Sequence, residues 1–144
     1  MALASLFGGL ALSNAKLGAV HGFAGPIGGM FDAPHGAICA ALLAPVMHVN
    51  IRALRERDAH GEAMRRYDEI ARLLTGDSHM RADDGADWVA HLSADLKIPP
   101  LSSYGITHND LPAIIEKSAV ASSMQGNPIR LTPDELQAAL EMAL

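Results

Sequence analysis

The sequence predicts an all-α helical bundle, and three features carry that prediction. Apolar residues recur at three- and four-residue steps, most clearly over residues 62–74, as on one face of an amphipathic helix. Prolines, glycines and capping residues divide the chain into segments of helical length. No alternating strand pattern of useful length occurs. With 144 residues the chain is long enough for one helical domain with its own core, over residues 1–144.

The first third of the chain is almost free of charge. Residues 1–51 carry only Lys16 and Asp32 as charged side chains, whereas the later part is richly charged. A helix that is apolar all round is usually buried on all sides, so this part is expected to form the centre of the bundle, beginning with a helix over residues 1–16. Soluble monomers rarely expose large contiguous apolar patches. Some of this surface therefore needs a cover from outside, and we expect at least a dimer.

Prolines and glycines mark the next two helices. A short helix is expected over residues 21–30, interrupted by Pro26 and ended by the glycine pair at its end. Pro34 fits the start of a longer helix that reaches about residue 54. Pro45 removes one backbone donor inside that helix, and we expect a kink there.

The charged part of the chain continues as amphipathic helices. The helix over residues 62–74 is expected to stop at Gly76. Asp83 or Asp84 can cap the next helix, which ends before the proline pair at residues 99–100. Its apolar stripe consists of Trp88, Leu92 and Leu96.

The last two helices begin at polar caps. Asn109 or Asp110 can cap the first of them, which is expected to continue to Met124. The second has a capping box, with Thr132 as the N-cap, a proline at the first helical position and Glu135 three residues after the cap.

Composition excludes several classes of function. The net charge of −5 gives no reason to expect nucleic acid as a partner, because nucleic-acid binding relies on a concentrated basic surface. The start of the chain lacks the basic region of a secretory signal, and no uninterrupted apolar run reaches the length of about 18–20 residues that a membrane helix needs. The single cysteine, Cys39, cannot form an internal disulfide and is expected to be a buried, inert thiol. We therefore expect a cytoplasmic protein without a membrane partner.

The segment from Gly18 to Gly36 is the most informative part of the sequence. It sets His21 and His35 fourteen residues apart in apolar, glycine-rich surroundings. Two imidazoles in a low-dielectric setting are suited to a divalent metal. On spacing alone, hydrogen-bonded core histidines are the commoner case.

This segment resembles the signature of the iron-containing (group III) alcohol dehydrogenase family, which includes lactaldehyde reductases, butanol dehydrogenases and maleylacetate reductases. The closing segment from residue 126 to 144 is similar to the end of these enzymes, and the chain looks like the C-terminal part of their helical metal-binding domain only. Within the signature, the resembling residues are Gly18, His21, Gly22, Ala24, Gly28, Gly29, Phe31, Pro34, His35 and Gly36, followed by Ala40, Leu42, Leu43, Pro45, Val46 and Asn50.

The resemblance implies a metal- and NAD(P)-dependent oxidoreductase that acts on a small alcohol or aldehyde. It implies that His21 and His35 are metal ligands for iron or zinc, while no catalytic or nicotinamide-binding residue is assigned. In the family a nucleotide-binding α/β domain comes first and the helical domain second, so this chain is expected to lack the first domain and to be inactive by itself.

Two departures from the family pattern affect the site. The remaining family ligands are an aspartate and a histidine four positions apart, earlier in the chain, and the twenty residues before His21 contain neither residue type. Asp87 and His91 have this spacing but come after His35, so we do not assign them as ligands. Gly25 occupies a position where several family members carry an additional histidine beside nicotinamide and substrate, so no side chain at that position can shuttle a proton.

Three functions remain open at this point. The chain can be part of an alcohol dehydrogenase or aldehyde reductase, with a maleylacetate reductase-like enzyme as a sub-case suggested by the run GGMFDAPH. It can be a stand-alone helical oligomer that serves as a scaffold or binding module. It can also be one half of a split enzyme, completed by a separate nucleotide-binding chain.

Overall fold

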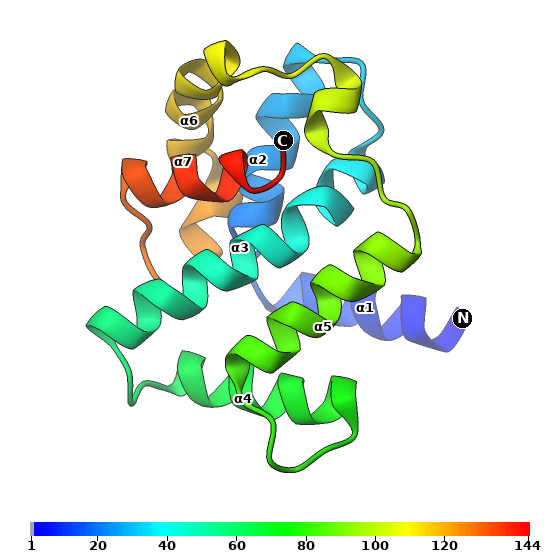
Figure 1. Ribbon diagram of the computed structural model, residues 1–144, viewed down its shortest axis with the longest axis vertical. Helices are drawn as coiled ribbons and strands as arrows, with labels where there is room; N and C mark the ends of the chain where they lie inside the picture. The colour runs from blue at the N-terminus through cyan, green and yellow to red at the C-terminus, as the bar shows by residue number, and fades with distance from the viewer. Residues whose placement is uncertain (1) are drawn as a thin grey trace.

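Seven α-helices and three short 3-10 segments make up the computed structural model, which describes residues 2–144 and contains no strand among them (Figure 1). The all-α bundle predicted from the sequence is confirmed. In chain order the elements are α1 (Ala2–Asn14), α2 (Ala19–Met30), α3 (His35–Arg57), α4 (Glu62–Thr75), α5 (Ala82–Asp95), η1 (Leu101–Tyr104), η2 (His108–Asp110), α6 (Leu111–Ala119), η3 (Ser122–Gly126) and α7 (Pro133–Glu141).

The long helix α3 is the axis of the fold. It crosses the middle of the molecule, with α2, α6 and α7 on one side and α4 and α5 on the other (Figure 1). On the first side the core is formed by fully buried side chains such as Phe23, Ile38 and Leu140. On the second side a smaller cluster contains Ile51 and Ala86. Pro45 is buried inside α3, which continues through it as one helix.

By its length and its apolar composition alone, helix α3 could also cross a membrane. Its most apolar 18-residue window has a mean hydropathy of 1.6, and 56% of that window is buried inside the fold. The core helix of a water-soluble bundle has the same character, because it is covered by other helices on most sides. Helices α2, α5 and α7 pack against α3 and cover it, as neighbouring helices cover such a core helix.

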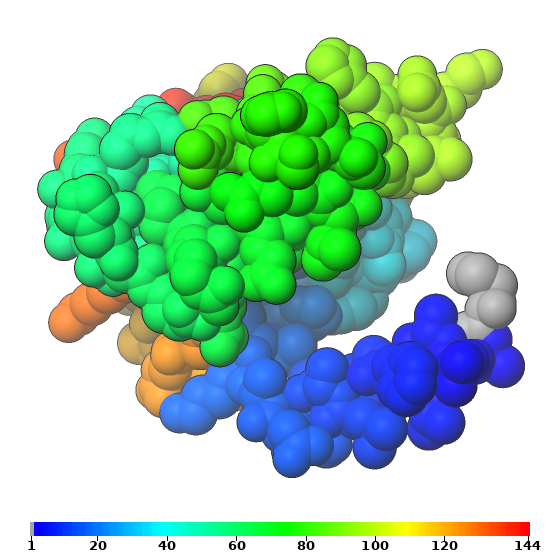
Figure 2. Space-filling model, turned by 90° about the horizontal axis from the view of Figure 1, so that it is seen from below, coloured from blue at the N-terminus to red at the C-terminus, as the bar shows by residue number. Residues whose placement is uncertain are grey.

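Helix α1 differs from the expectation for the first third of the chain. It has no buried residue, and it projects from the bundle at 95° to α2. Figure 2 shows it standing away from the rest of the molecule. Burial on all sides is therefore wrong for α1, although it holds for much of α2 and α3, because no other element of residues 2–144 packs along α1. Its large apolar side chains are half or more exposed, and these are Leu3, Leu6, Phe7, Leu10 and Leu12.

Helix α2 begins two residues earlier than predicted and has no interruption. It runs through Pro26 without a break and ends at Met30, as the range 21–30 predicts. The buried side chains of Phe23 and Ile27 lie on either side of the proline in sequence. Their packing in the core holds the helix together where local propensity alone predicts an interruption.

Helix α5 buries a different face from the one its large apolar residues predict. Trp88, Leu92 and Leu96 are 37%, 39% and 63% exposed. The buried face consists of small residues around Gly85, where an added Cβ would come within 2.9 Å of Ala71 in α4. Close packing of α4 against α5 thus turns the small residues inward and leaves the large ones at the surface.

The segment after α6 leaves the predicted helix early. Helix α6 ends at Ala119 instead of continuing to Met124, and the chain turns at Ala121 into η3. This turn brings η3 against α2, where a Cβ on Gly22 would come within 2.7 Å of the Met124 side chain. Helix α6 begins after Asp110, one of the two predicted N-caps, but the Asp110 carboxylate accepts hydrogen bonds from Thr107 in the preceding capping box rather than from α6 itself.

The predicted capping box of α7 is confirmed. The Glu135 amide donates to the Thr132 hydroxyl at 3.3 Å, and the Thr132 amide donates to the Glu135 carboxylate at 2.7 Å. Arg57, at the end of α3, adds a two-pronged contact to the same carboxylate at 2.9 and 3.1 Å. These hydrogen bonds fix the start of α7 against the end of α3.

Candidate metal centre

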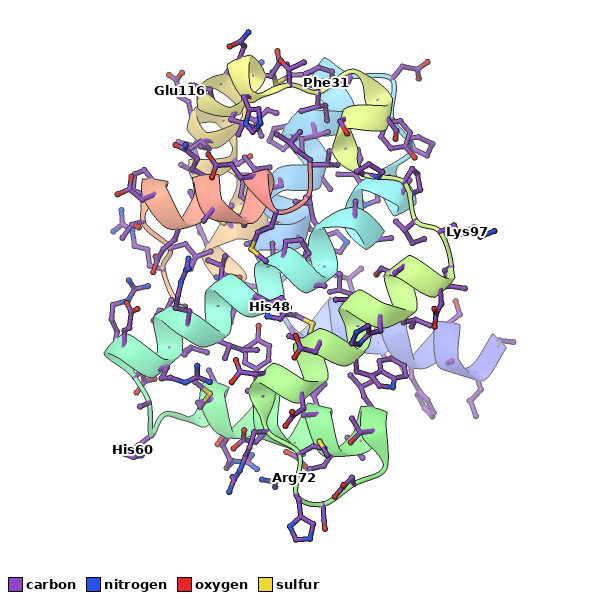
Figure 3. All side chains as sticks on the ribbon, viewed as in Figure 1. Phe31, His48, His60, Arg72, Lys97 and Glu116 are labelled. Atoms are coloured by element: carbon purple, nitrogen blue, oxygen red, sulfur yellow. The ribbon has the colours of Figure 1, made fainter. Side chains whose placement is uncertain are left out.

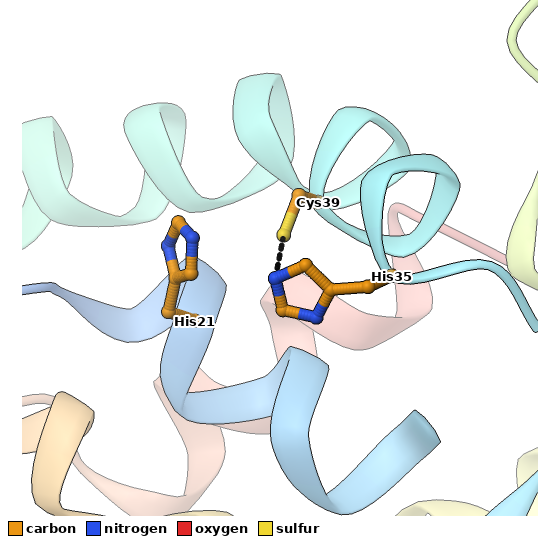
Figure 4. Close-up of side chains that lie close together, drawn as sticks. All are labelled: His21, His35 and Cys39. Atoms are coloured by element: carbon orange, nitrogen blue, oxygen red, sulfur yellow. Dashed lines mark hydrogen bonds between the residues drawn. The ribbon is translucent and has the colours of Figure 1, made fainter. Parts of the chain in front are cut away.

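The structure brings His21 and His35 together at the contact between α2 and α3. Their ring centroids are 5.4 Å apart and the ring planes are inclined by 52°. Cys39 joins them, and its Sγ lies 3.5 Å from His35 Nε2 (Figure 4). One donor atom from each of the three side chains lies within 4.8 Å of the other two. Among residues 2–144 this is the one cluster of three such side chains close enough to share a metal ion.

The start of α2 positions His21. Gly18, the N-cap, has no side chain that could accept a hydrogen bond from the first turn. Asn127, 108 residues further along the chain, caps the helix instead. Its Oδ1 accepts a hydrogen bond from the Ala19 amide at 3.0 Å. A helix whose first amide is satisfied in this way is fixed at its N-terminus, and His21 lies in that first turn.

A buried amide pair holds Asn127 in place. Asn50 of α3 is 2% exposed and exchanges two hydrogen bonds with Asn127, at 3.2 and 2.7 Å. Asn50 also donates to the Tyr67 hydroxyl of α4 at 3.1 Å. Burial raises the pKa of Tyr67, although the hydrogen bond from Asn50 opposes this effect. The network therefore connects α2, α3, α4 and the segment before α7 beside the histidine pair.

His35 and Cys39 are positioned by the first turn of α3. Pro34 is extended and precedes the helix, so His35 is the first helical residue. Residues four apart in a helix lie on one face, which places Cys39 directly over His35. The first-turn location leaves His35 exposed, whereas His21 and Cys39 are half-buried.

The prediction of a buried Cys39 is therefore corrected. The thiol is only partly buried, and it touches an imidazole rather than core side chains alone. Burial raises the pKa of the Cys39 thiol. The sequence placed Cys39 in an apolar helix pattern, and the four-residue step from His35 is the signal that could have pointed to their contact.

An open pocket of about 430 Å³ adjoins the cluster. Its walls are mainly apolar, and its polar groups come from His21, Cys39 and the network of Asn50, Tyr67 and Asn127. Gly25, one turn along α2 from His21, has open space where a side chain would be. The arrangement offers donor atoms at the edge of a small, largely apolar hollow, as is usual for small-molecule sites.

Asp87 and His91 lie elsewhere in the fold. Both are exposed residues of α5 and belong to no cluster with His21 and His35. Asp87 faces His48 of α3, with the carboxylate 3.5 Å from Nε2. Figure 3 shows His48 between α3 and α5.

A larger hollow of about 630 Å³ lies between α6, η3 and α7. Glu116 and Arg130 are its ionisable groups, and no histidine or cysteine lines it. The clustered histidine and cysteine donor atoms are therefore at the smaller pocket, beside α2 and α3.

The helical bundle, in which a glycine-rich segment brings two histidines together, has the architecture that the resemblance implies, a helical domain of an alcohol dehydrogenase-type oxidoreductase. More specifically, the chain belongs to the iron-containing alcohol dehydrogenase family. The family model described as "Fe-containing alcohol dehydrogenase family, C-terminal" matches residues 1–144.

Individual relatives agree with this assignment. The chain is 34% identical over 142 residues to lactaldehyde reductase of Escherichia coli K12, covering 94% of this chain and 35% of the relative. It is 37% identical over 134 residues to 1,3-propanediol dehydrogenase of Citrobacter freundii, covering 89% and 32%. The structure of an alcohol dehydrogenase from Oenococcus oeni superposes with a TM-score of 0.77 and 29% identity, covering 94% and 35%. The chain thus spans about a third of the length of the relatives it matches.

Proposed function

We propose that this chain is the C-terminal helical part of a metal- and NAD(P)-dependent alcohol dehydrogenase or aldehyde reductase that acts on a small alcohol or aldehyde. His21 and His35 are the residues of this chain that would hold the divalent metal. The proposal is supported chiefly by one observation: two histidines from different helices converge with their rings 5.4 Å apart, at the edge of a pocket.

The donor set fits a divalent cation. Neutral imidazole is a good ligand for zinc and for ferrous iron, and both rings belong to one group of close donor atoms. When bound, a divalent cation supplies Lewis-acid polarisation of an alcohol or carbonyl oxygen. The role of this chain is to hold that cation between α2 and α3 and to keep His21 in place through the Asn127 cap.

The adjoining pocket favours a small substrate. Its walls beside His21 are apolar and include Val20, Leu43 and Met47, and its volume of about 430 Å³ suits a small molecule. Gly25 leaves the surface beside His21 bare, so a proton is exchanged through solvent or the substrate's own groups rather than through a side chain at this position. The names of the two relatives, lactaldehyde reductase and 1,3-propanediol dehydrogenase, indicate short polar molecules as the first substrates to test.

A complete enzyme also requires a nucleotide-binding body. The exposed apolar side chains of α1 give that body, or a second copy of the chain, a surface on which to pack. We expect residues 1–144 alone to lack dehydrogenase activity, and we assign the complete enzyme to the cytoplasm, with no nucleic-acid or membrane partner.

The test compares the chain alone with a fusion. In the fusion, the part of E. coli lactaldehyde reductase that precedes the matched region is joined to this chain. Both proteins are loaded with zinc or ferrous iron and assayed for NAD(P)H oxidation with lactaldehyde. We expect activity in the fusion only, its loss in His21→Ala and His35→Ala, and its retention in His79→Ala, which changes an exposed histidine far from the pair in sequence. Activity that survives both replacements of the paired histidines would contradict the proposal.

The runner-up function is a stand-alone helical scaffold, which the exposed face of α1 favours. A scaffold needs no metal. A folded oligomer of this chain, together with a fusion that binds neither zinc nor iron under the same conditions, would support the scaffold over the enzyme.

A further inference from the structure

We propose that the hollow between α6, η3 and α7 is a binding site for a free amino acid with a large apolar side chain. The ligand's carboxylate faces Arg130, its ammonium group faces Glu116, and its side chain lies against the apolar walls. Neither histidine of the pair lines this hollow. The inference therefore goes beyond the proposed function and does not depend on it.

The size and the walls of the hollow suit a small molecule. Its volume of about 630 Å³ lies within the range of about 300–1,000 Å³ that is typical of small-molecule sites. Three elements that meet there supply the apolar surface, with Ile115 from α6, Met124 from η3 and Leu136 from α7 (Figure 1). Leu136 is only 4% exposed and belongs to the core. The floor of the hollow is therefore formed before any ligand binds.

Two unpaired charges of opposite sign line the same hollow. Glu116 lies on α6, where Figure 3 labels it, and Arg130 lies in the segment before α7. Both side chains are exposed. Among residues 2–144 neither side chain forms an ion pair, with the other or with any third residue. A ligand that carries both charges can therefore make a charge-assisted hydrogen bond to each side chain.

The charges select a zwitterion over simpler ligands. A guanidinium group such as that of Arg130 matches the two oxygens of a carboxylate, and an ammonium group donates to a carboxylate such as that of Glu116. A fatty acid would place its carboxylate beside the like charge of Glu116, and a simple amine would place its charge beside Arg130. An amino acid avoids both repulsions. An aromatic side chain also gains from contact with a methionine sulfur, which Met124 provides.

Two wall residues of the hollow also hold the start of α2. Met124 packs so closely against Gly22 that an added Cβ would lie 2.7 Å from its Cε. Asn127 accepts the hydrogen bond from the Ala19 amide. A ligand that binds only the ordered wall stabilises it by mass action. Occupancy of the hollow is therefore expected to reach the first turn of α2, where His21 lies.

The first experiment measures the affinity of three related probes by nuclear magnetic resonance titration. L-Phenylalanine carries both charges, N-acetyl-L-phenylalanine lacks the ammonium charge, and L-phenylalanine amide lacks the carboxylate. The titrations are made at about pH 6.5, because the α-amino group has an ordinary pKa of about 7.7–8.0 and is protonated there. We expect each blocked probe to bind about tenfold more weakly than phenylalanine, since each loses one charge-assisted contact.

Two conservative variants assign the contacts. Arg130→Gln is expected to weaken the binding of phenylalanine about tenfold but not that of the amide, which has no carboxylate to lose. Glu116→Gln is expected to weaken phenylalanine by a similar factor but not the N-acetyl probe. Arg52→Gln and Glu56→Gln change exposed residues of α3 outside the hollow and are expected to leave all three affinities unchanged. Circular dichroism checks that each variant is folded.

Hydrogen exchange locates the bound ligand. With saturating phenylalanine, the amides of residues 122–127 and the Ala19 amide are expected to exchange more slowly, while those of α5 keep their rates. The inference is overturned if phenylalanine does not bind, if both blocked probes bind as tightly as it does, or if both charge variants bind it like the wild type. Protection confined to other parts of the chain would overturn it as well. The metal affinity of the histidine pair is measured separately, so these outcomes leave the proposed function standing.

Discussion

Asn50 and Asn127, separated by 77 residues in sequence, exchange a reciprocal pair of hydrogen bonds beside the histidine pair. Asn127 also donates to the Ile129 carbonyl at 2.8 Å and accepts from the Ala19 amide at the start of α2. Both atoms of its side-chain amide group therefore have partners. One side chain thus fixes a loop, the central helix and the helix that carries His21.

The first prediction concerns this amide pair. Asn127→Ala leaves the Asn50 amide, which is 2% exposed, without its main partner and uncaps the Ala19 amide. An unsatisfied buried polar group costs about 1–3 kcal/mol. We expect the free energy of unfolding in urea to fall by about that amount, and zinc affinity to weaken because His21 is less well positioned. Gln125→Ala, an exposed change in η3, is the control and is expected to alter neither quantity.

The second prediction compares two glycines of α2. A Cβ on Gly22 would lie 2.7 Å from Met124 Cε, which can rotate away, and 3.3 Å from Met124 Cα, so Gly22→Ala requires η3 to shift by a few tenths of an ångström. Such overpacking typically costs about 1–3 kcal/mol. Gly29 has nothing within 4 Å of the same position, and Gly29→Ala is expected to stabilise the helix by about 0.5–1 kcal/mol. The midpoint of thermal unfolding is measured for both variants. A shift of both midpoints in the same direction, relative to the wild type, would contradict this account.

Local sequence signals predicted the ends of several helices. The box of Thr132 and Glu135 lies within four residues, so its hydrogen bonds depend on little beyond the chain itself. The same holds for Gly76, which ends α4 in the left-handed conformation with φ 72°. Which face of α5 is buried could not be predicted in this way, because the exposure of Trp88 follows from the close packing at Gly85.

The candidate site shows a similar division. His21 and His35 were found from their motif, and the structure adds that their rings are near each other. The hydrogen-bond network behind them was missed, because the partners of Asn127 are 77 and 108 residues away in sequence. A buried asparagine within an apolar run, as Asn50 is, was the available signal. The contact of Cys39 with His35 needed only the helical step of four residues.

The third prediction concerns acid stability. Glu135 is only 13% exposed. Burial works to raise its pKa, but hydrogen bonds from Arg57 and from the Thr132 amide outweigh this effect and leave the pKa below its ordinary value. A carboxylate with a lowered folded-state pKa stabilises the fold fully above its unfolded pKa of about 4.3 and loses this contribution as the pH falls through the folded pKa.

Glu135→Gln removes this charge and tests whether the charged carboxylate stabilises or destabilises the folded state. At pH 7 we expect the variant to be less stable than the wild type by about 1 kcal/mol, because a charge-assisted contact is replaced by a neutral one. Urea unfolding at a series of pH values is expected to give a constant difference from pH 7 to about 5 and a shrinking difference below about 4.3. A difference that grows as the pH falls would show that the ion pair with Arg57 does not stabilise the folded state.

The fourth prediction concerns α1. Because this helix has no buried residue, deletion of residues 2–14 is expected to leave the unfolding midpoint of the remaining bundle unchanged at low protein concentration. We expect copies of the chain to associate through the exposed apolar face of α1, which includes Leu6 and Phe7. Light scattering is therefore expected to show an oligomer for the intact chain and a monomer for the shortened one. An unchanged oligomer after deletion would place the association surface elsewhere, with the exposed stripe of Trp88 on α5 as the next surface to test.

The fifth prediction uses heat to measure metal binding. A metal that binds the folded state only, at a concentration 100 times its dissociation constant, adds about 2.7 kcal/mol of stability. For a chain of 144 residues this corresponds to a rise in Tm of roughly 9 °C. We expect zinc and cobalt to produce such a rise and magnesium to produce none, because imidazole suits the former ions and oxygen ligands the latter. His21→Ala and His35→Ala are each expected to remove the rise, since either change leaves one histidine of the pair. A rise of equal size with magnesium, or one that persists in both variants, would place the bound metal among the exposed carboxylates of α4 and α5 rather than between α2 and α3.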